Sequence, residues 1–228
     1  MIENSIYFGT ALTLISYYIA LRIYEAKKKA WFHPVFVSAA IIIIFLSITN
    51  VPIDLYNNAS RYVMYFLTPA TVCLAVPMYK RVAILREHKY LIGVSVLIGA
   101  MSAIFVVLGL VMLFKFDPVV LKSIISKSIT TGVALGLTEQ LGGILPLAAM
   151  AVVITGVFGA MIMESSFKVF KITDPIAKGL AAGVSAHVIG TSKALEIDKL
   201  AGAISSVAMI ITAILTVIIV PIVLNTFL

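Results

Sequence analysis

The chain consists of long apolar stretches separated by short groups of polar residues, glycines and prolines. Several stretches approach 20 residues, the length at which an α-helix crosses the ~30 Å hydrocarbon core of a bilayer. The alternation of period two that is typical of a β-barrel is not seen in the sequence. The pattern therefore predicts an all-α polytopic membrane protein. Breaks at Gly, Pro and charged residues divide it into eight segments: 5–24, 34–52, 61–79, 90–114, 118–138, 144–165, 175–194 and 200–227.

Composition supports a membrane protein, because 61% of the 228 residues are hydrophobic and only 12% are charged. Segment 5–24 has no basic region before it and no small-residue cleavage site, so we interpret it as a transmembrane helix rather than a signal peptide. The net charge of +7 is concentrated in loops, which the positive-inside rule places in the cytoplasm. The basic residues after the first and third segments are Arg22, Lys27, Lys28, Lys29, Lys80, Arg81, Arg86 and Lys89. No nucleic-acid partner is expected, since aromatic residues are not interleaved with these charges.

Three further lysines constrain the topology. Lys168, Lys171 and Lys178 follow the sixth segment and also favour the cytoplasm, but they would lie outside if every segment spanned the membrane. The conflict disappears if residues 118–140 form a re-entrant hairpin, with two half-helices of about 10 residues that each rise about 15 Å. The sequence thus predicts about seven spanning helices plus one re-entrant hairpin.

The same topology predicts a single transmembrane domain, 1–228, with two inverted halves at 34–114 and 144–227. Interrupted helices at corresponding positions of inverted halves are typical of transporter binding sites. An alternative is that these residues only kink or pack ordinary transmembrane helices. The expected helix breaks are Pro69, Pro77, Gly132 and Gly183.

Four blocks follow one another along the whole chain: TPATVCLAVPMYK (68–80), SKSITTGVALGLTEQLGG (126–143), DPIAKGLAAGVSAHVIGTSKALE (174–196) and GAISSVAM (202–209). Together they resemble the signature sequences of the LrgB/CidB family. The chain departs from the usual family pattern at Thr68 and Gly132, where the family has Gly and Pro, and at Ser126 and Ser192, where it has Pro and Ala.

The resemblance implies a multi-pass protein of the bacterial inner (plasma) membrane, paired with a small LrgA/CidA-type membrane partner. The family was first described as antiholin-like regulators of murein hydrolase activity, and it is related to a plastid glycolate/glycerate translocator and associated with pyruvate transport. Two functions therefore compete: a secondary carrier of small monocarboxylates, which we favour, and a holin-linked regulator of cell lysis. Self-association is a further expectation.

Polar residues in the apolar segments favour the carrier, since a carboxylate in a membrane needs positive charge and hydrogen-bond donors. Lys127 and Lys193 supply charge, although either lysine would instead snorkel to the interface if it lies near a helix end. The predicted substrate-binding residues are Thr71, Lys127, Ser128, Thr130, Thr131, His187, Gly190, Thr191 and Lys193.

His187 is a candidate for proton coupling because imidazole titrates near neutral pH, and Glu139 would be one if it were buried. The alternative for His187 is a packing residue bonded to a carbonyl oxygen. No enzyme activity, cofactor or metal site is expected, because three scattered histidines and the lone Cys73 form no catalytic or ligand cluster. Ser185 and His187 are two residues apart and lie on different faces of a helix.

Overall fold

The computed structural model describes residues 7–27, 32, 34–66, 69, 73, 79 and 82–227. Every regular element among these residues is a helix, as the all-α prediction requires. The chain forms two compact units, Met1–Ala75 and Val76–Leu228, and each is described by itself.

The first unit contains helices α1 (Phe8–Lys27), α2 (Pro34–Thr49), α3 (Ile53–Ala59) and α4 (Arg61–Tyr65). Gly9 lets α1 approach α3 closely, because a Cβ atom there would lie 2.6 Å from the carbonyl oxygen of Tyr56. The hydroxyl of Thr10 donates to the carbonyl oxygen of Ala59 at 2.9 Å. These contacts fix the packing of α1 on α3 through backbone proximity rather than through large side chains.

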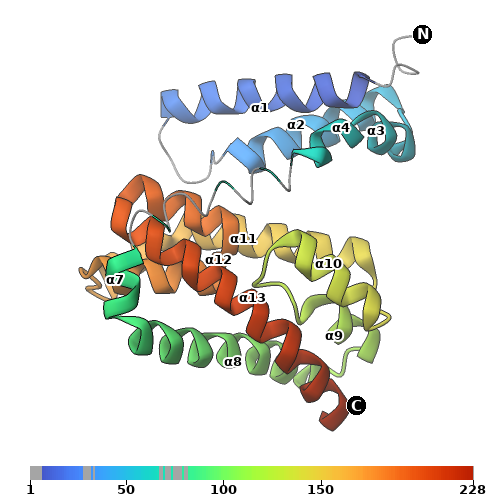
Figure 1. Ribbon diagram of the computed structural model, residues 1–228. Coiled ribbons are helices and arrows are strands. Elements are labelled where there is room, and N and C mark those ends of the chain that lie inside the picture. The colour runs from blue at the N-terminus through green and yellow to red at the C-terminus, as the bar shows by residue number, and fades with distance from the viewer. Residues whose placement is uncertain are drawn as a thin grey trace. The chain divides into compact units, whose positions relative to one another are not determined.

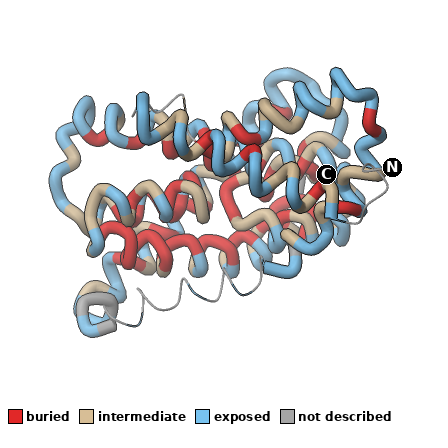
Figure 2. Tube along the Cα trace, turned by 90° about the horizontal axis from the view of Figure 1, so that it is seen from above, coloured by how far each residue is buried: buried red, intermediate tan, exposed pale blue. Residues whose placement is uncertain are grey.

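The second unit carries the features developed below. Its elements in chain order are α7 (Val82–Glu87), α8 (Lys89–Leu113), α9 (Pro118–Ile124), α10 (Thr131–Gln140), α11 (Leu145–Val169), α12 (Pro175–Ile197) and α13 (Lys199–Phe227) (Figure 1). Buried residues lie along the inward sides of the helices, and the outward sides are exposed (Figure 2).

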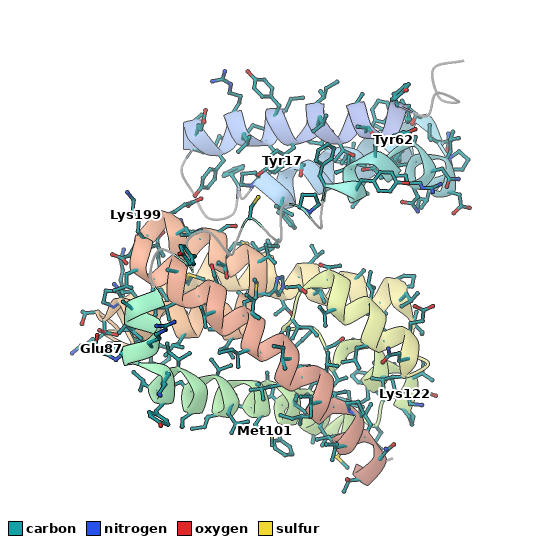
Figure 3. The ribbon with its side chains drawn as sticks, in the orientation of Figure 1. Tyr17, Tyr62, Glu87, Met101, Lys122 and Lys199 are labelled. Atoms are coloured by element: carbon teal, nitrogen blue, oxygen red, sulfur yellow. The ribbon has the colours of Figure 1, made fainter. Side chains whose placement is uncertain are left out.

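Three of the described helices, α8, α11 and α13, are long and apolar enough to cross a membrane. Helix α2 is apolar but has only 16 residues. Of the charged residues labelled in Figure 3, Glu87 and Lys199 lie at one end of the second unit and Lys122 lies toward the other. This distribution fits a bundle whose middle faces hydrocarbon. The predicted total of about seven spans counted residues 175–194 as one span, and these residues fold back on themselves as described below. The spanning of the other predicted segments stays a prediction.

Residues 118–140 form a helical hairpin, here called hairpin 1, with α9 and α10 as its legs. The chain leaves helical structure at residues 125–130, between the legs. The hydroxyls of Ser126 and Thr138, both buried, lie 3.3 Å apart and join the tip to the second leg. Gly132 lies inside the first turn of α10, so the prediction of a helix break at Gly132 was wrong by a few residues. The membrane depth of the hairpin stays a prediction.

Helix α12 is a second helical hairpin rather than one interrupted span. Ala186 and His187 have non-helical backbone angles, with φ +41° at His187. A Cβ atom on Gly190 would lie 2.8 Å from the carbonyl oxygen of Ala182, whereas eight residues of continuous helix would separate the two by about 12 Å. The second leg therefore folds back along the first. We call residues 175–197 hairpin 2, with its tip at Ala186–His187.

A break in the seventh segment is thus confirmed, but the predicted interrupted span is wrong, because the chain reverses at Ala186–His187, between Gly183 and Gly190. Gly183 is helical, and a Cβ atom there would meet the carbonyl oxygen of Ser205 on α13 and lie 2.9 Å from the Cβ of Ala208. It is a packing glycine and not a helix break, because its missing side chain lets the first leg contact the α13 backbone.

The two hairpins are approached in the same way. Each follows a 25-residue helix, α8 or α11, and the residue after that helix is a phenylalanine. The next residue is a lysine with left-handed backbone, Lys115 (φ +51°) or Lys171 (φ +53°). An Asp-Pro pair then begins the first leg, and the carboxylate of Asp117 or Asp174 accepts a backbone N–H bond. Helices α8 and α11 run in opposite directions (Figure 1).

This correspondence relates residues 89–140 to 145–197 as a repeat of helix plus hairpin in opposite orientation. This repeat does not have the same bounds as the inverted halves predicted from the sequence, 34–114 and 144–227. Those halves stay a prediction. Pro77 and Thr71 lie outside the described residues. Pro69 is exposed, and its immediate neighbours are not described, so a break there also stays a prediction.

Candidate functional site

Lys127 lies at the tip of hairpin 1 and lines two cavities. Its ammonium Nζ is 3.3 Å from the hydroxyl of Ser128, which is also at the tip. The side chain is half-buried, and no ion pair to Lys127 occurs within 4.0 Å in the described part of the chain. A partly buried cation without a counter-ion is costly in a membrane, which makes this position a candidate anion site.

The first cavity has a volume of about 520 Å³ and lies between α8, the tip of hairpin 1 and the first leg of hairpin 2. Four hydroxyl side chains from these three elements line it together with Lys127: Ser95, Ser102, Ser128 and Ser185. The hydroxyls of Ser102 and Ser185 donate to the carbonyl oxygens of Gly99 and Ala181, so Lys127 and Ser128 are the groups that we expect to donate to a small anion here.

The second cavity has a volume of about 500 Å³ and lies between α11, the tip of hairpin 1 and the first leg of hairpin 2. Thr155 and Ser166 of α11 provide hydroxyls, and Phe158 and Ile162 provide apolar surface. Lys127 is therefore flanked by two cavities with different partner helices.

Both cavities share three lining residues: Lys127, Ala181 and Ser185. Ala181 and Ser185 are one helical turn apart on the first leg of hairpin 2, and the Ser185 hydroxyl donates to the Ala181 carbonyl oxygen at 2.6 Å. The first leg of hairpin 2 and the tip of hairpin 1 thus form the boundary between the two cavities. The small size of both residues leaves room next to the lysine.

His187 forms the tip of hairpin 2, and only 2% of its surface is exposed. Its Nε2 lies 2.9 Å from the backbone carbonyl oxygen of Val152 on α11, and the ring lies against Gly156. This is the packing role that was the alternative interpretation of His187. Proton coupling through His187 stays a prediction, and this contact does not by itself test it.

Thr191 and Gly190 contact neighbouring helix segments and do not line the cavities beside Lys127. The Thr191 hydroxyl donates to the His187 carbonyl oxygen at 2.8 Å and also lies 2.8 Å from the Ser205 hydroxyl on α13. Gly190 lies against Ala182 and Ala186 of the first leg. Neither residue lines either of the cavities beside Lys127.

Lys193 lies in a different place from Lys127. Its Nζ forms ion pairs with Glu164 at 2.9 Å and Glu196 at 3.2 Å, and it lines a third cavity near the ends of α11 and α12. The structure therefore does not bring Lys127 and Lys193 to one cavity. The reason is the fold-back of hairpin 2, which returns Lys193 toward the start of α12.

The remaining predicted residues lie around hairpin 1. Thr130 precedes α10 without a capping bond from its side chain, and Thr131 begins the helix; both are half-buried. Glu139 is exposed near the end of α10, so the burial that proton coupling through this residue required is missing.

The sequence interpretation missed the hydroxyls contributed by the neighbouring helices. Ser95, Gly99 and Ser102 recur at helical spacing on α8, as do Thr155, Gly159 and Ser166 on α11. That spacing places each set on one helix face. It was the available signal, although single small residues in apolar helices are also typical of helix packing.

Comparison with known proteins decides the family. The sequence model of the LrgB-like family matches residues 13–226. The chain belongs to the LrgB-like family. A relative from Bacillus cereus (strain B4264), named antiholin-like protein LrgB, is 31% identical over 216 residues, which are 94% of this chain and 94% of the relative. No solved structure matches the chain with significance. The resemblance drawn from the four sequence blocks is confirmed.

Proposed function

We propose that this LrgB-family chain is a secondary carrier that binds small monocarboxylates, of the pyruvate, glycolate or glycerate class, at Lys127. The observation that carries the proposal is the position of Lys127 at the tip of hairpin 1, between two cavities lined by hydroxyls. The Lys127 ammonium group, which has no ion pair within 4.0 Å among the described residues, forms a charge-assisted bond to a carboxylate. Ser128 donates a neutral bond to the same ligand, and the Ser185 oxygen, whose proton goes to the Ala181 carbonyl, accepts a bond from a 2-hydroxyl group.

The cavities fit this substrate class. Volumes of about 520 and 500 Å³ fall within the range of small-molecule sites and leave room for water around a three-carbon acid. A single cation offsets the single negative charge of a monocarboxylate. A dicarboxylate would keep one charge without a partner in these cavities, which opposes its entry.

The two hairpins supply a mechanism for access. Helices α8 and α11 run in opposite directions, and each is followed by a hairpin, as in carriers built from inverted repeats. The first leg of hairpin 2 lies between the two cavities. A displacement of this leg would narrow one cavity and widen the other, and it would therefore change access to Lys127.

A second candidate function is antiholin-like regulation of murein hydrolase activity and lysis. The comparisons favour it more directly than transport, because the relative at 31% identity is named antiholin-like and its name states no transported substrate. In both proposals the chain lies in the bacterial inner membrane as a multi-pass protein with an LrgA/CidA-type partner. Self-association of the chain is compatible with either.

Uptake into vesicles that contain the chain, with and without its small partner, separates the two functions. A carrier takes up labelled pyruvate, glycolate or glycerate until the rate saturates, and close analogues compete. A holin-like pore passes unrelated solutes such as sugars in proportion to their concentration. Non-saturable leakage of sugars and carboxylates would reject the carrier in favour of the lysis-related function.

A further inference from the structure

The third cavity, of about 720 Å³, lies between the C-terminal end of α11 and the open end of hairpin 2. Both legs of the hairpin contribute to it, since Lys178 comes from the first leg and Lys193 from the second. Six charged residues line the cavity: Glu164, Lys168, Lys171, Lys178, Lys193 and Glu196. Four lysines and two glutamates leave a net charge of 4 − 2 = +2.

The positive charge of this cavity is not balanced inside the described part of the chain. Both glutamates are engaged by one lysine, because Lys193 Nζ lies 2.9 Å from Glu164 and 3.2 Å from Glu196. Lys168, Lys171 and Lys178 form no ion pair within 4.0 Å among the described residues. Three cations thus share one cavity without a close counter-ion, which attracts an anion of more than one negative oxygen.

The inner surface of the same cavity is apolar. Phe167, Ile172 and Ile197 line it and pack in one hydrophobic cluster with Met163 and Ala182. Next to the lysines on α11, Phe170 is 73% exposed. A free inorganic anion would gain nothing from these apolar groups, whereas a ligand with an acyl chain beside its anionic head would bury them.

The cavity also lies at the end of an apolar span. Helix α11 is long and apolar enough to cross a bilayer, and Lys168 and Lys171 lie at its last turn and just beyond it. Lysines at the end of a span meet the lipid headgroups, and the positive-inside rule predicts the cytoplasmic leaflet for these lysines, where anionic lipids attract basic residues.

We propose that this cavity binds the phosphoryl headgroup of an anionic phospholipid, with Lys168, Lys171 and Lys178 on the phosphate and an acyl chain on the apolar residues. The proposal does not depend on what Lys127 binds, and it holds for either function considered above. It assigns to these lysines a ligand as well as the topological role that the sequence predicts for them.

Lys115 provides a matched control for Lys171. Each lysine follows a phenylalanine at the end of a 25-residue helix and has left-handed backbone, with φ +51° and +53°. Lys115 does not line this cavity. A substitution at either position removes one charge beside an apolar span, but only Lys171→Gln removes it from the proposed site.

The test uses the full chain purified in a non-ionic detergent and titrated with phosphatidylglycerol, phosphatidylcholine or inorganic phosphate. Retained lipid is counted by native mass spectrometry. We expect phosphatidylglycerol to bind more tightly than phosphatidylcholine, with a loss of about fivefold for Lys171→Gln and about 25-fold for Lys168→Gln with Lys171→Gln. Lys115→Gln should leave the affinity within twofold, and Lys171→Arg should retain it.

Three results would overturn the proposal. Equal losses in Lys171→Gln and Lys115→Gln would mean general attraction to interfacial lysines. Equal affinity for inorganic phosphate and phosphatidylglycerol would mean a free-anion site. Loss of binding in Lys171→Arg as well would mean that substitution disturbs the turn. In that case Lys178→Gln, on the first leg of hairpin 2, tests the site independently, and unchanged lipid binding in this variant would reject the site.

Discussion

The imidazole Nε2 of His187 lies 2.9 Å from the backbone carbonyl oxygen of Val152, so the tip of hairpin 2 is tied directly to α11. His187 has φ +41°, a conformation that costs a non-glycine residue of the order of 1–3 kcal/mol. The bond to Val152 and the close contact of the ring with Gly156 offset that cost. Val152 also belongs to one buried cluster with Ile129 and Ala134 of hairpin 1, so both hairpins are anchored close to this residue of α11.

Substitution of Gly156 by alanine should disturb this junction. The added Cβ would lie 2.5 Å from Cε1 and 2.8 Å from Nε2 of His187, so the ring or the tip must move. We expect a loss of stability of about 1–3 kcal/mol, measured as a lower melting temperature in detergent. Gly109→Ala on α8 is the control, because no atom lies within 4 Å of its added Cβ. Equal melting temperatures for the two variants would contradict the close contact.

The fold-back of α12 can be tested by cross-linking. Lys178 and Lys193 line one cavity, whereas 15 residues of continuous helix would separate them by about 22 Å. Cysteines at these two positions, with Cys73 replaced by serine, should be joined by a bifunctional reagent that spans about 10 Å. A pair at Lys178 and Lys122, which lies in hairpin 1 and lines none of the described cavities, is the control. If the cysteines at positions 178 and 193 are not linked within one chain, the fold-back is contradicted and a single interrupted helix is favoured.

Ser185→Ala should weaken monocarboxylate uptake without loss of folded protein. Ser185 lines both cavities beside Lys127, and loss of one neutral hydrogen bond costs about 1 kcal/mol, or roughly fivefold in affinity. Ser192, on the second leg of hairpin 2, lines none of the described cavities. The control variant Ser192→Ala should therefore leave the concentration for half-maximal uptake unchanged. If both variants behave alike, Ser185 does not contact the substrate.

The first hairpin was predictable from the sequence and the second was not, for a physical reason. Residues 126–131 place a lysine and four hydroxyls in succession, and such a run cannot continue as a lipid-facing helix. At the tip of hairpin 2 the chain turns at Ala186 and His187, neither of which is a strong helix breaker. The turn depends on contacts with Val152 and Gly156, which lie 35 and 31 residues before His187.

The residues of the candidate site were likewise only partly predictable from the sequence. Lys127 and Ser128 were predicted because they are adjacent in sequence and polar within an apolar segment. Lys193 looked equivalent, but its partner Glu164 is 29 residues away and on another helix, so the ion pair was not visible in the sequence. Ser185 was considered only for its spacing from His187, and its position beside Lys127 depends on the packing of two hairpins.

Lys193→Gln should therefore affect uptake much less than a change at Lys127. Its charge is engaged by Glu164 and Glu196 in the third cavity, so its loss frees two carboxylates but removes no group from the cavities beside Lys127. We expect the concentration for half-maximal monocarboxylate uptake to stay within about threefold. A shift of tenfold or more would mean that the two lysines share a site after all.

The most direct test of the account is the saturation of labelled pyruvate uptake by vesicles that contain Lys127→Gln. Loss of a charge-assisted bond costs about 1.5–3 kcal/mol, so the half-saturating concentration should rise more than tenfold, and Lys127→Arg should restore part of the affinity. Lys122→Gln, in the same hairpin but in none of the described cavities, should behave as the unmodified chain. Saturable uptake with the same half-saturating concentration in Lys127→Gln and Lys122→Gln would contradict the assignment of Lys127 as the carboxylate site.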